Sequence, residues 1–443
     1  MNVIALVDGE HYPPVTRWGL DVARSRGLEP VAALFLGGTE KVSPGPPPDL
    51  GVRVAVAGDD LAASLRALER EVSADAVLDL SDAPVLEMPD RALLVSTALA
   101  CGLAYLAGDA RFDPPVVEPP PAVPTVGVIG TGKRAGKTAV AAHIARTAAD
   151  RGLSPTIVAM GRGGPSRPVA VASGGVSLAD LRALVERGEH AASDYLEDAV
   201  TTGVPTVGAR RVGGGVAGAP FATNVAEAAR LAERSGAGLV VLEGSGAAVP
   251  TIAWDAGVLV APAATALGQL GGWLGPYRLL LSDLVVLTMA ASPQAGLENL
   301  PTLRSLIRRI RGDARLIVTD FEPVPLGDVQ GRDAFFTTTA PPATAERQAA
   351  SIEARWGCRV VGWSARLADR AGLAQDMDEA EGFDVLLTEL KAAAVDVAAG
   401  RAEALGADVV FVDNRPVAVD GDGDLDGELE RILDLAVARR SER

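Results

Sequence analysis

Short apolar runs alternate with polar, helix-like stretches along the first part of the chain. Four runs have the length and the valine- and leucine-rich composition of buried strands: Val3 to Val7, Val31 to Leu36, Val52 to Val56 and Ala76 to Leu80. The segments between them near Thr16 to Arg24 and Leu61 to Val72 are typical of helices. Strands that alternate with helices in this way predict a parallel, Rossmann-like α/β sheet.

The most informative stretch runs from Val126 to Thr138 and reads VGVIGTGKRAGKT. A short apolar strand enters a glycine-rich turn, and an alanine-rich helix follows to about Arg151. Glycines let backbone N–H groups surround a phosphate, and the helix N-terminus adds partial positive charge. The pattern predicts a P-loop, in which Lys137 contacts the β- and γ-phosphates and the Thr138 hydroxyl binds Mg²⁺. We expect the nucleotide to be bound by Gly130, Thr131, Gly132, Lys133, Arg134, Ala135, Gly136, Lys137 and Thr138.

A carboxylate follows a second strongly apolar strand. Residues Gly238 to Leu242 show no polar alternation, which is typical of a strand buried on both faces, and the run ends at Glu243-Gly244-Ser245-Gly246. In P-loop proteins an acid at this place binds Mg²⁺ directly or through water. The alternative is an ordinary strand-terminal turn. No Asn-Lys-x-Asp guanine signature occurs in the sequence, which favours ATP over GTP.

Lysine is rare in this chain. Only four of the 41 lysine and arginine residues are lysines, and two of the four, Lys133 and Lys137, lie in the predicted P-loop. A compact ammonium group on a flexible stem is useful there. We therefore treat Lys41 and Lys391 as candidate site residues, with chance as the competing explanation.

Two arginine-containing turns are candidate anion contacts. The predicted strand Thr156 to Met160 ends at Gly161-Arg162-Gly163-Gly164-Pro165, where an arginine beside a P-loop is expected to bind an acceptor phosphate or transition-state charge. Arg210 and Arg211 lie in a flexible, glycine-rich stretch that offers a second anion contact. An ordinary surface turn is the alternative in each case.

Three loops of the first region also collect polar residues. They follow predicted strands and span Asp8 to Tyr12, Gly37 to Lys41, and Ser81 to Asp82. Each alone is typical of an ordinary turn between a strand and a helix. Together they lie at one edge of the predicted sheet, where α/β proteins hold ligands. We therefore name Asp8, Glu10, His11 and Lys41 as candidate substrate-binding residues.

Prolines are concentrated in the segment just before the P-loop strand. Residues 114–124 have the composition of a stiff, extended linker. We predict an N-terminal α/β acceptor-binding domain over residues 1–121, a P-loop NTPase core over 122–330, and a C-terminal α/β segment over 331–443 that completes or packs on the core. Lys391 lies in an alanine-rich run that could form a surface helix or could bring this lysine to the nucleotide or the acceptor.

Charge and composition exclude several classes of partner. The 443-residue chain has a formal net charge of −16, which argues against nucleic acid or an anionic membrane surface. No apolar run approaches the roughly 20 residues of a membrane span. Two cysteines, Cys101 and Cys358, indicate no disulfide framework, and three scattered histidines argue against zinc. We expect a soluble cytoplasmic protein that binds a small anionic substrate in a basic cleft.

Five stretches spread over nearly the whole length resemble the cyclic 2,3-diphosphoglycerate synthetase family. They are Ala5 to Pro14, Phe35 to Lys41, Ile129 to Thr138, Met160 to Pro165, and Glu389 to Val397. The P-loop spacing, with glycine at 130 and threonine at 131, and the Glu-Gly-Ser-Gly run also resemble dethiobiotin synthetase. The resemblance implies an ATP-dependent ligase that closes an intramolecular phosphoanhydride in 2,3-bisphosphoglycerate, with Mg²⁺ as cofactor and a homodimer as the assembly.

The resemblance also implies separate roles for the candidate residues. Lys137, Lys133, Arg162 and Glu243 would be catalytic, and Thr138 and Glu243 would hold the metal. The acceptor would be bound by Asp8, Glu10, His11, Lys41, Arg162, Arg210, Arg211 and Lys391. Two other functions stay open from the residues alone, namely a P-loop kinase of another small anionic metabolite and a regulatory or partitioning ATPase. The partitioning class is disfavoured because Gly132 occupies the position of its signature lysine.

Overall fold

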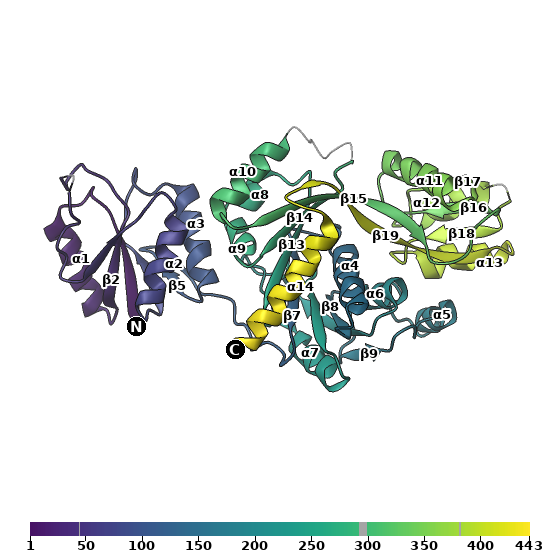
Figure 1. Ribbon diagram of the computed structural model, residues 1–443, viewed down its shortest axis with the longest axis horizontal. Helices are drawn as coiled ribbons and strands as arrows, with labels where there is room; N and C mark the ends of the chain where they lie inside the picture. Colours follow the sequence, from purple (N-terminus) through teal and green to yellow (C-terminus); the bar gives the residue numbers. More distant parts are fainter. Residues whose placement is uncertain (44, 292–298, 381) are drawn as a thin grey trace.

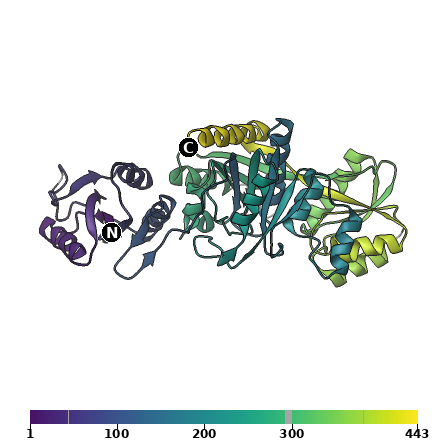
Figure 2. The same cartoon turned by 90° about the horizontal axis from the view of Figure 1, so that it is seen from below.

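The computed structural model describes residues 1–43, 45–291, 299–380 and 382–443 and has an elongated shape with three lobes in a row (Figure 1). The N-terminal lobe lies at one end, the P-loop lobe in the middle and the C-terminal lobe at the other end. Figure 2 shows the same order from a perpendicular direction. Within the described ranges no helix is both long and apolar enough to cross a membrane.

The N-terminal lobe is built on a six-stranded sheet. Its strands lie in the order β3-β2-β1-β4-β5-β6, and all neighbours pair in parallel except β5 and β6. This order is that of a Rossmann-like sheet, and the four predicted strands lie where the sequence indicated them. The elements are β1 (Asn2–Val7), α1 (Pro13–Ser25), β2 (Glu29–Phe35), β3 (Arg53–Val56), α2 (Leu61–Glu71), β4 (Ala76–Asp79), α3 (Met88–Ala100), β5 (Ala104–Leu106) and β6 (Arg111–Phe112).

The P-loop lobe contains the centre of a second, 13-stranded sheet. The strand order β10-β8-β12-β7-β13-β14-β15 is parallel throughout, so all these strands end at one edge. The strands are β7 (Thr125–Gly130), β8 (Pro155–Gly161), β9 (Val169–Val171), β10 (Thr206–Val212), β11 (Ala222–Thr223), β12 (Leu239–Glu243), β13 (Ala256–Pro262), β14 (Leu284–Thr288) and β15 (Arg315–Pro325). The helices are α4 (Lys137–Asp150), α5 (Leu178–Glu186), α6 (Asp194–Thr202), α7 (Val225–Arg234), α8 (Leu267–Gly271), α9 (Gly275–Leu280) and α10 (Leu300–Ile310).

The C-terminal lobe continues the same sheet through one long strand. Strand β19 pairs with β15 in antiparallel fashion along its second half and with β18 in parallel along its first half. The sheet therefore runs without interruption from the P-loop lobe into the C-terminal lobe. The elements are β16 (Asp333–Thr337), α11 (Pro342–Trp356), β17 (Arg359–Ser364), α12 (Arg370–Glu379), β18 (Val385–Thr388), a π-helical turn (Ala394–Ala399), α13 (Gly400–Ala404), β19 (Asp408–Gly421) and α14 (Leu425–Ser441).

The last helix returns to the P-loop lobe and closes its core. Leu429, Ile432 and Leu433 of α14 are fully buried against β7, α4 and β13. Burying such side chains contributes about 1.5–3 kcal/mol each by transfer from water. Two ion pairs fix the far end of the helix, because Arg440 binds the buried Asp255 at 2.8 Å and Arg439 binds Asp283 at 2.9 Å.

The N-terminal lobe packs on the P-loop lobe mainly through α3 and α9. Leu274 and Tyr277 belong to the apolar cluster that fills the N-terminal lobe. Phe112 and Trp273 meet edge to face, with ring centroids 5.6 Å apart. This apolar contact attaches the first lobe to the side of the P-loop lobe that faces away from the C-terminal lobe (Figure 1).

Candidate active site

The P-loop has the local geometry that its sequence predicts. Strand β7 ends at Gly130 and helix α4 begins at Lys137, with Gly136 in the left-handed region at φ 88°. A Cβ at Gly130 would lie 2.8 Å from Cδ of Lys137, so the lysine stem requires glycine at this position. The side chain of Lys137 reaches back over the turn, and its Nζ donates to the Gly132 carbonyl at 2.9 Å.

The predicted metal-binding pair is in direct contact. Strand β12 pairs in parallel with β7, and this register brings Glu243 beside the start of α4. The Thr138 hydroxyl donates to Oε1 of Glu243 at 2.7 Å, while Oε2 is buried and has no hydrogen-bond partner within the described structure. Burial, and then the negative charge of Asp194, raise the pKa of Glu243 to about 8. The carboxylate is therefore held in a place that favours a nearby cation.

Helix α6 supplies two acids that the sequence analysis missed. Asp194 begins the helix beside the cavity, and Asp198 lies one turn later with no exposed surface. Neither carboxylate oxygen of Asp198 has a partner among the placed residues. Burial, followed by the neighbouring Glu243 carboxylate, raises the pKa of Asp198 well above its usual range. The i, i+4 spacing of the two aspartates was the available signal, because it places both on one helix face.

Arg162 and Arg211 converge on the P-loop, whereas Arg210 does not. A Cβ at Gly246 would lie 3.4 Å from an Nη of Arg162 and 3.3 Å from an Nη of Arg211. Burial lowers the pKa of the Lys137 ammonium, and both guanidinium groups act in the same direction. Side chains alternate along a strand, so Arg210 points away from Arg211, and its Nε donates to the Gly164 carbonyl at 2.7 Å.

One cavity of about 740 Å³ lies between the P-loop lobe and the C-terminal lobe. Its walls include the P-loop, the ends of β8, β12, β13 and β14, the start of α6, and the C-terminal residues Thr339 to Pro341. Polar neutral groups such as Asn414 lie beside charged ones. Its cationic lining residues are Lys133, Arg134, Lys137, Arg162, Arg347 and Lys391. Arg347 was missed because its helix shows no glycine-rich or strand-end signal.

Lys391 lines this cavity from the C-terminal side. Its Nζ lies 3.0 Å from Oε1 of Glu197 on helix α6. Burial lowers the pKa of Lys391, but the carboxylates of Glu197 and Glu389 outweigh burial and raise it overall. Glu389 is itself fixed, because it accepts hydrogen bonds from Thr338, Thr339 and Asn414. The alternative of a surface helix at Lys391 is wrong, since the residue follows strand β18 in a tight turn.

The N-terminal candidates form a separate cluster. Asp8 is buried and accepts from Nδ1 of His11 at 2.8 Å and from the Glu10 N–H at 3.0 Å. Lys41 pairs with Glu40, and its Nζ lies 5.7 Å from the centre of the Tyr12 ring. None of these residues lines the cavity, because the P-loop lobe lies between the two end lobes (Figure 1). The second wall of the cavity comes from the C-terminal lobe instead.

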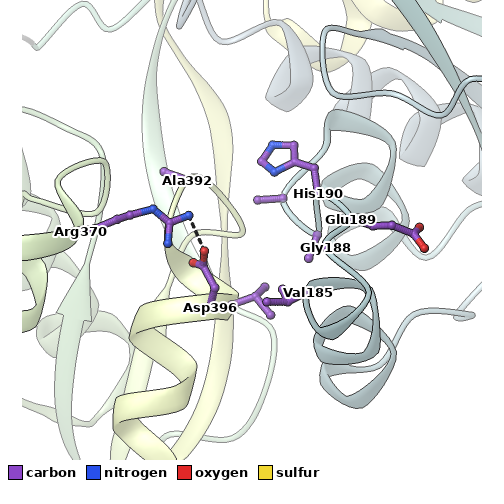
Figure 3. Close-up of a pocket in the computed structure, with 10 residues that line it drawn as sticks. Val185, Gly188, Glu189, His190, Arg370, Ala392 and Asp396 are labelled. Atoms are coloured by element: carbon purple, nitrogen blue, oxygen red, sulfur yellow. Dashed lines mark ion pairs between the residues drawn. The ribbon is translucent and has the colours of Figure 1, made fainter.

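A smaller pocket of about 200 Å³ adjoins the main cavity, since the two share His190, Ala192 and Ala392 in their linings. Figure 3 shows Arg370 pointing toward Asp396, with which it forms an ion pair, and His190 on the opposite wall. Because Asp396 already neutralises Arg370, this pocket offers an anion less charge than the main cavity does. His190 lines both spaces and packs over Gly163, where a Cβ would lie 2.5 Å from its ring.

Family models match three consecutive parts of the chain. They are the cyclic 2,3-diphosphoglycerate synthetase N-terminal domain over residues 2–113, its P-loop domain over 125–320 and its C-terminal domain over 325–415. The family resemblance that the sequence motifs indicated is thereby confirmed.

Curated relatives match along the whole chain. The cyclic 2,3-diphosphoglycerate synthetase of Rubrobacter xylanophilus is 45% identical over 445 residues, covering 100% of this chain and 99% of the relative. That of Methanothermobacter thermautotrophicus is 40% identical and covers 99% of this chain and 97% of the relative. The synthetase of Methanothermus fervidus is 37% identical and covers 98% of this chain and 97% of the relative. This chain therefore belongs to the cyclic 2,3-diphosphoglycerate synthetase family.

Proposed function

We propose that this protein is an ATP-dependent ligase that joins the two phosphates of 2,3-bisphosphoglycerate into an intramolecular anhydride. The products are cyclic 2,3-diphosphoglycerate, ADP and inorganic phosphate. The observation that carries the proposal is a single cavity in which a P-loop faces separate cations from β8 and from the C-terminal lobe. Two highly charged substrates that react together need two cationic walls, because their negative charges repel each other as the reacting atoms approach.

The strand order supports a division of the cavity into two sides. Strands β14 and β15 lie on one side of β7, where Met289, Phe321 and Pro341 make the lining more apolar. An apolar side suits the nucleoside of ATP. Strands β12 and β8 lie on the other side, with Arg162 and, beyond them, Arg211. We assign that charged side to the acceptor.

The reaction proceeds in two displacements. An oxygen of one acceptor phosphate attacks the γ-phosphorus of ATP, the bond to the β-phosphate oxygen breaks, and ADP leaves. The second acceptor phosphate then attacks the inner phosphorus of the new diphosphate, closes the ring and expels inorganic phosphate. The attacking group in the second step is tethered to its target, which replaces a bimolecular encounter by a unimolecular one.

The chain's own residues neutralise the charge that this chemistry gathers. Lys137, Lys133 and Arg134 serve the ATP phosphates, since all three lie in the P-loop wall. Arg162, Arg211 and Lys391 serve the acceptor. Lys137 is held by the Gly132 carbonyl and Lys391 by Glu197. Lys137 is therefore oriented over the P-loop turn by a neutral carbonyl, whereas Lys391 is oriented in the cavity wall by a carboxylate.

The residues around Thr138 fit a magnesium ion. Oε2 of Glu243 and both oxygens of Asp198 are buried without partners in the described part of the chain. Among the residues that the structure places, no group of three or more acidic, histidine or cysteine side chains holds a metal alone. Mg²⁺ commonly takes one or two protein ligands and completes its shell with phosphate oxygens and water. Bound by Thr138 and Glu243, it would neutralise charge between the β- and γ-phosphates.

Phosphorus NMR of the purified protein with Mg-ATP and 2,3-bisphosphoglycerate tests the function. We expect the phosphomonoester signals to move to the anhydride region while ADP and free phosphate appear together. ATP consumption only with another acceptor would favour a kinase of a different metabolite. Absence of turnover with any small acceptor would favour a regulatory ATPase. The homodimer and the cytoplasmic location stay predictions.

A pair of lysine variants tests which lobe binds the acceptor. We expect Lys391→Met to raise the KM for 2,3-bisphosphoglycerate roughly tenfold, because a charge-assisted contact is worth about 1.5–3 kcal/mol. Lys41→Met removes the same group from the N-terminal cluster and should leave that KM unchanged. Steady-state kinetics with each substrate varied in turn measures both values. If Lys41→Met raised this KM and Lys391→Met did not, the acceptor would be bound by the N-terminal lobe instead.

A further inference from the structure

The turn that follows Glu243 forms part of the acceptor side of the cavity. Gly244, Ser245 and Gly246 line the cavity, and the turn continues to Val249. From strand β10, an Nη of Arg211 donates to the Ser245 carbonyl at 2.9 Å. The position of Arg211 is therefore tied to the position of this turn.

Arg278 holds the same turn from the opposite side. It lies on helix α9, and its Nη2 and Nε donate to the Ala247 carbonyl at 2.6 and 3.2 Å. Two bonds from one planar guanidinium to one carbonyl restrict both the position and the direction of that carbonyl. Burial lowers the pKa of this guanidinium, and it does not line the cavity. Arg278 thus acts on the site only through the backbone.

The hairpin between β10 and β11 completes this junction. The Gly218 carbonyl accepts from the Val249 N–H at 2.9 Å. Gly218 has φ +90°, and a Cβ there would lie 2.8 Å from an Nη of Arg278 and 2.9 Å from the Ala247 oxygen. The neighbouring Ala217 is buried in the apolar cluster of the N-terminal lobe. The hairpin that begins just after Arg211, the turn and α9 therefore meet at one closely packed point.

Helix α9 also carries the contact with the N-terminal lobe. Tyr277, next to Arg278, packs in one cluster with Leu94, Val95 and Ala98 of α3. Figure 1 shows α3 and α9 facing each other across the boundary of the two lobes. The N-terminal lobe thus supports the helix from which Arg278 reaches the turn. Its side chains do not enter the cavity.

We propose that Arg278 is a positioning residue, which holds the turn over residues 244–249 and thereby ties the acceptor side of the cavity to the docked N-terminal lobe. The inference rests on the proposed ring-closing function. It gives the first lobe a role in acceptor binding that needs no direct contact with substrate. The Gly244 N–H is bonded to the Val128 carbonyl of β7 at 2.8 Å, so the start of the turn stays fixed with the P-loop strand. Loosening the turn beyond Gly244 displaces Arg211 and the glycine backbone at Gly246.

The test is a comparison of KM values for the two substrates. We expect Arg278→Met to raise the KM for 2,3-bisphosphoglycerate roughly tenfold, while the KM for ATP stays at the wild-type value. Arg278→Lys keeps the charge and one donor and should recover part of the loss. The control is Arg311→Met, because Arg311 binds the Leu280 carbonyl and Asp283 without touching the turn. It should change the two KM values equally or not at all.

A pair of glycine variants makes the test independent of charge. Gly218→Ala introduces both strain and the clash with Arg278, and we expect the same selective rise in the acceptor KM. Gly236→Ala imposes the same backbone strain at φ +91°, where a Cβ would meet nothing within 4 Å. It should lower stability without changing the ratio of the two KM values. Thermal unfolding of each variant shows that the kinetic measurements use folded protein.

A last variant tests the connection to the N-terminal lobe. Phe112→Ala removes the edge-to-face contact with Trp273, and we expect a smaller rise in the same KM. In the double variant with Arg278→Met, the KM for 2,3-bisphosphoglycerate should rise by less than the product of the two single-variant fold-changes. The inference would be overturned if Arg278→Met changed the KM for ATP and the KM for 2,3-bisphosphoglycerate equally. It would also be overturned if the fold-changes of the two single variants simply multiplied in the double variant. If the wild type itself closes no ring, the proposed function fails instead.

Discussion

Replacing Lys137 by methionine is expected to lower the rate of ATP turnover on the order of 1000-fold. Methionine keeps most of the length and the apolar stem that lies against Gly130, so the P-loop should fold. What is lost is the ammonium group that donates to the Gly132 carbonyl and that we propose contacts the transferred phosphate. Release of ADP in a coupled assay, with and without 2,3-bisphosphoglycerate, measures the effect.

The matched control for this variant lies at the other end of the same helix. Arg151→Met also replaces a cation by methionine, but it removes a partly exposed ion pair with Asp434 and a hydrogen bond to the Glu430 carbonyl, both away from the P-loop. Such pairs contribute about 0–1 kcal/mol to stability. We expect its turnover to equal that of the wild type. Retained turnover in Lys137→Met would contradict the assignment of Lys137 to the γ-phosphate.

Replacing Glu243 by glutamine is expected to reduce turnover roughly 100-fold and to raise the magnesium concentration needed for half-maximal rate. Glutamine has the same shape but is neutral, and its amide group cannot bind a cation as a carboxylate does. The Thr138 hydroxyl, which now donates to Glu243 at 2.7 Å, would keep a carbonyl partner. The rate measured against magnesium concentration at fixed ATP separates a metal defect from general damage.

Glu428→Gln serves as the control for that experiment. Glu428 is also buried, but it binds Arg315 and Arg431 near the start of α14, far from the cavity lining. We expect this variant to unfold at lower temperature and to keep the wild-type magnesium dependence. An unchanged magnesium dependence in Glu243→Gln would show that the carboxylate does not serve the metal.

Several features of the fold were predictable because they depend on short segments. The Rossmann-like strands of the first lobe, the P-loop strand and helix, and strand β12 each carry an apolar run of strand length followed by a turn or helix signal. The contact between Thr138 and Glu243 was also predictable. In a parallel sheet, two neighbouring strands that both end in functional turns deliver those turns to one edge.

Other features depended on contacts between distant segments. Strand β19 joins two lobes, and its second half pairs with β15, almost 100 residues earlier in the chain. No local pattern in residues 408–421 reveals that partner. The same holds for Asp198, whose burial depends on how α6 packs against α4, β8 and β10, and for Arg347, which reaches the cavity from helix α11.

The chain's own sequence determined the chemistry of the P-loop, the class of the fold and the family, because residue types at short, fixed spacing set local backbone geometry and phosphate contacts. Only the tertiary structure decided which lobe faces the P-loop. The polar loops of the N-terminal lobe and the lysine at position 391 were comparable candidates by composition. The continuous sheet through β19 brings Lys391 to within 3.0 Å of Glu197, while docking through α3 and α9 leaves Lys41 outside the cavity. Side-chain chemistry is local, but the opposing wall of a site depends on how separate lobes pack.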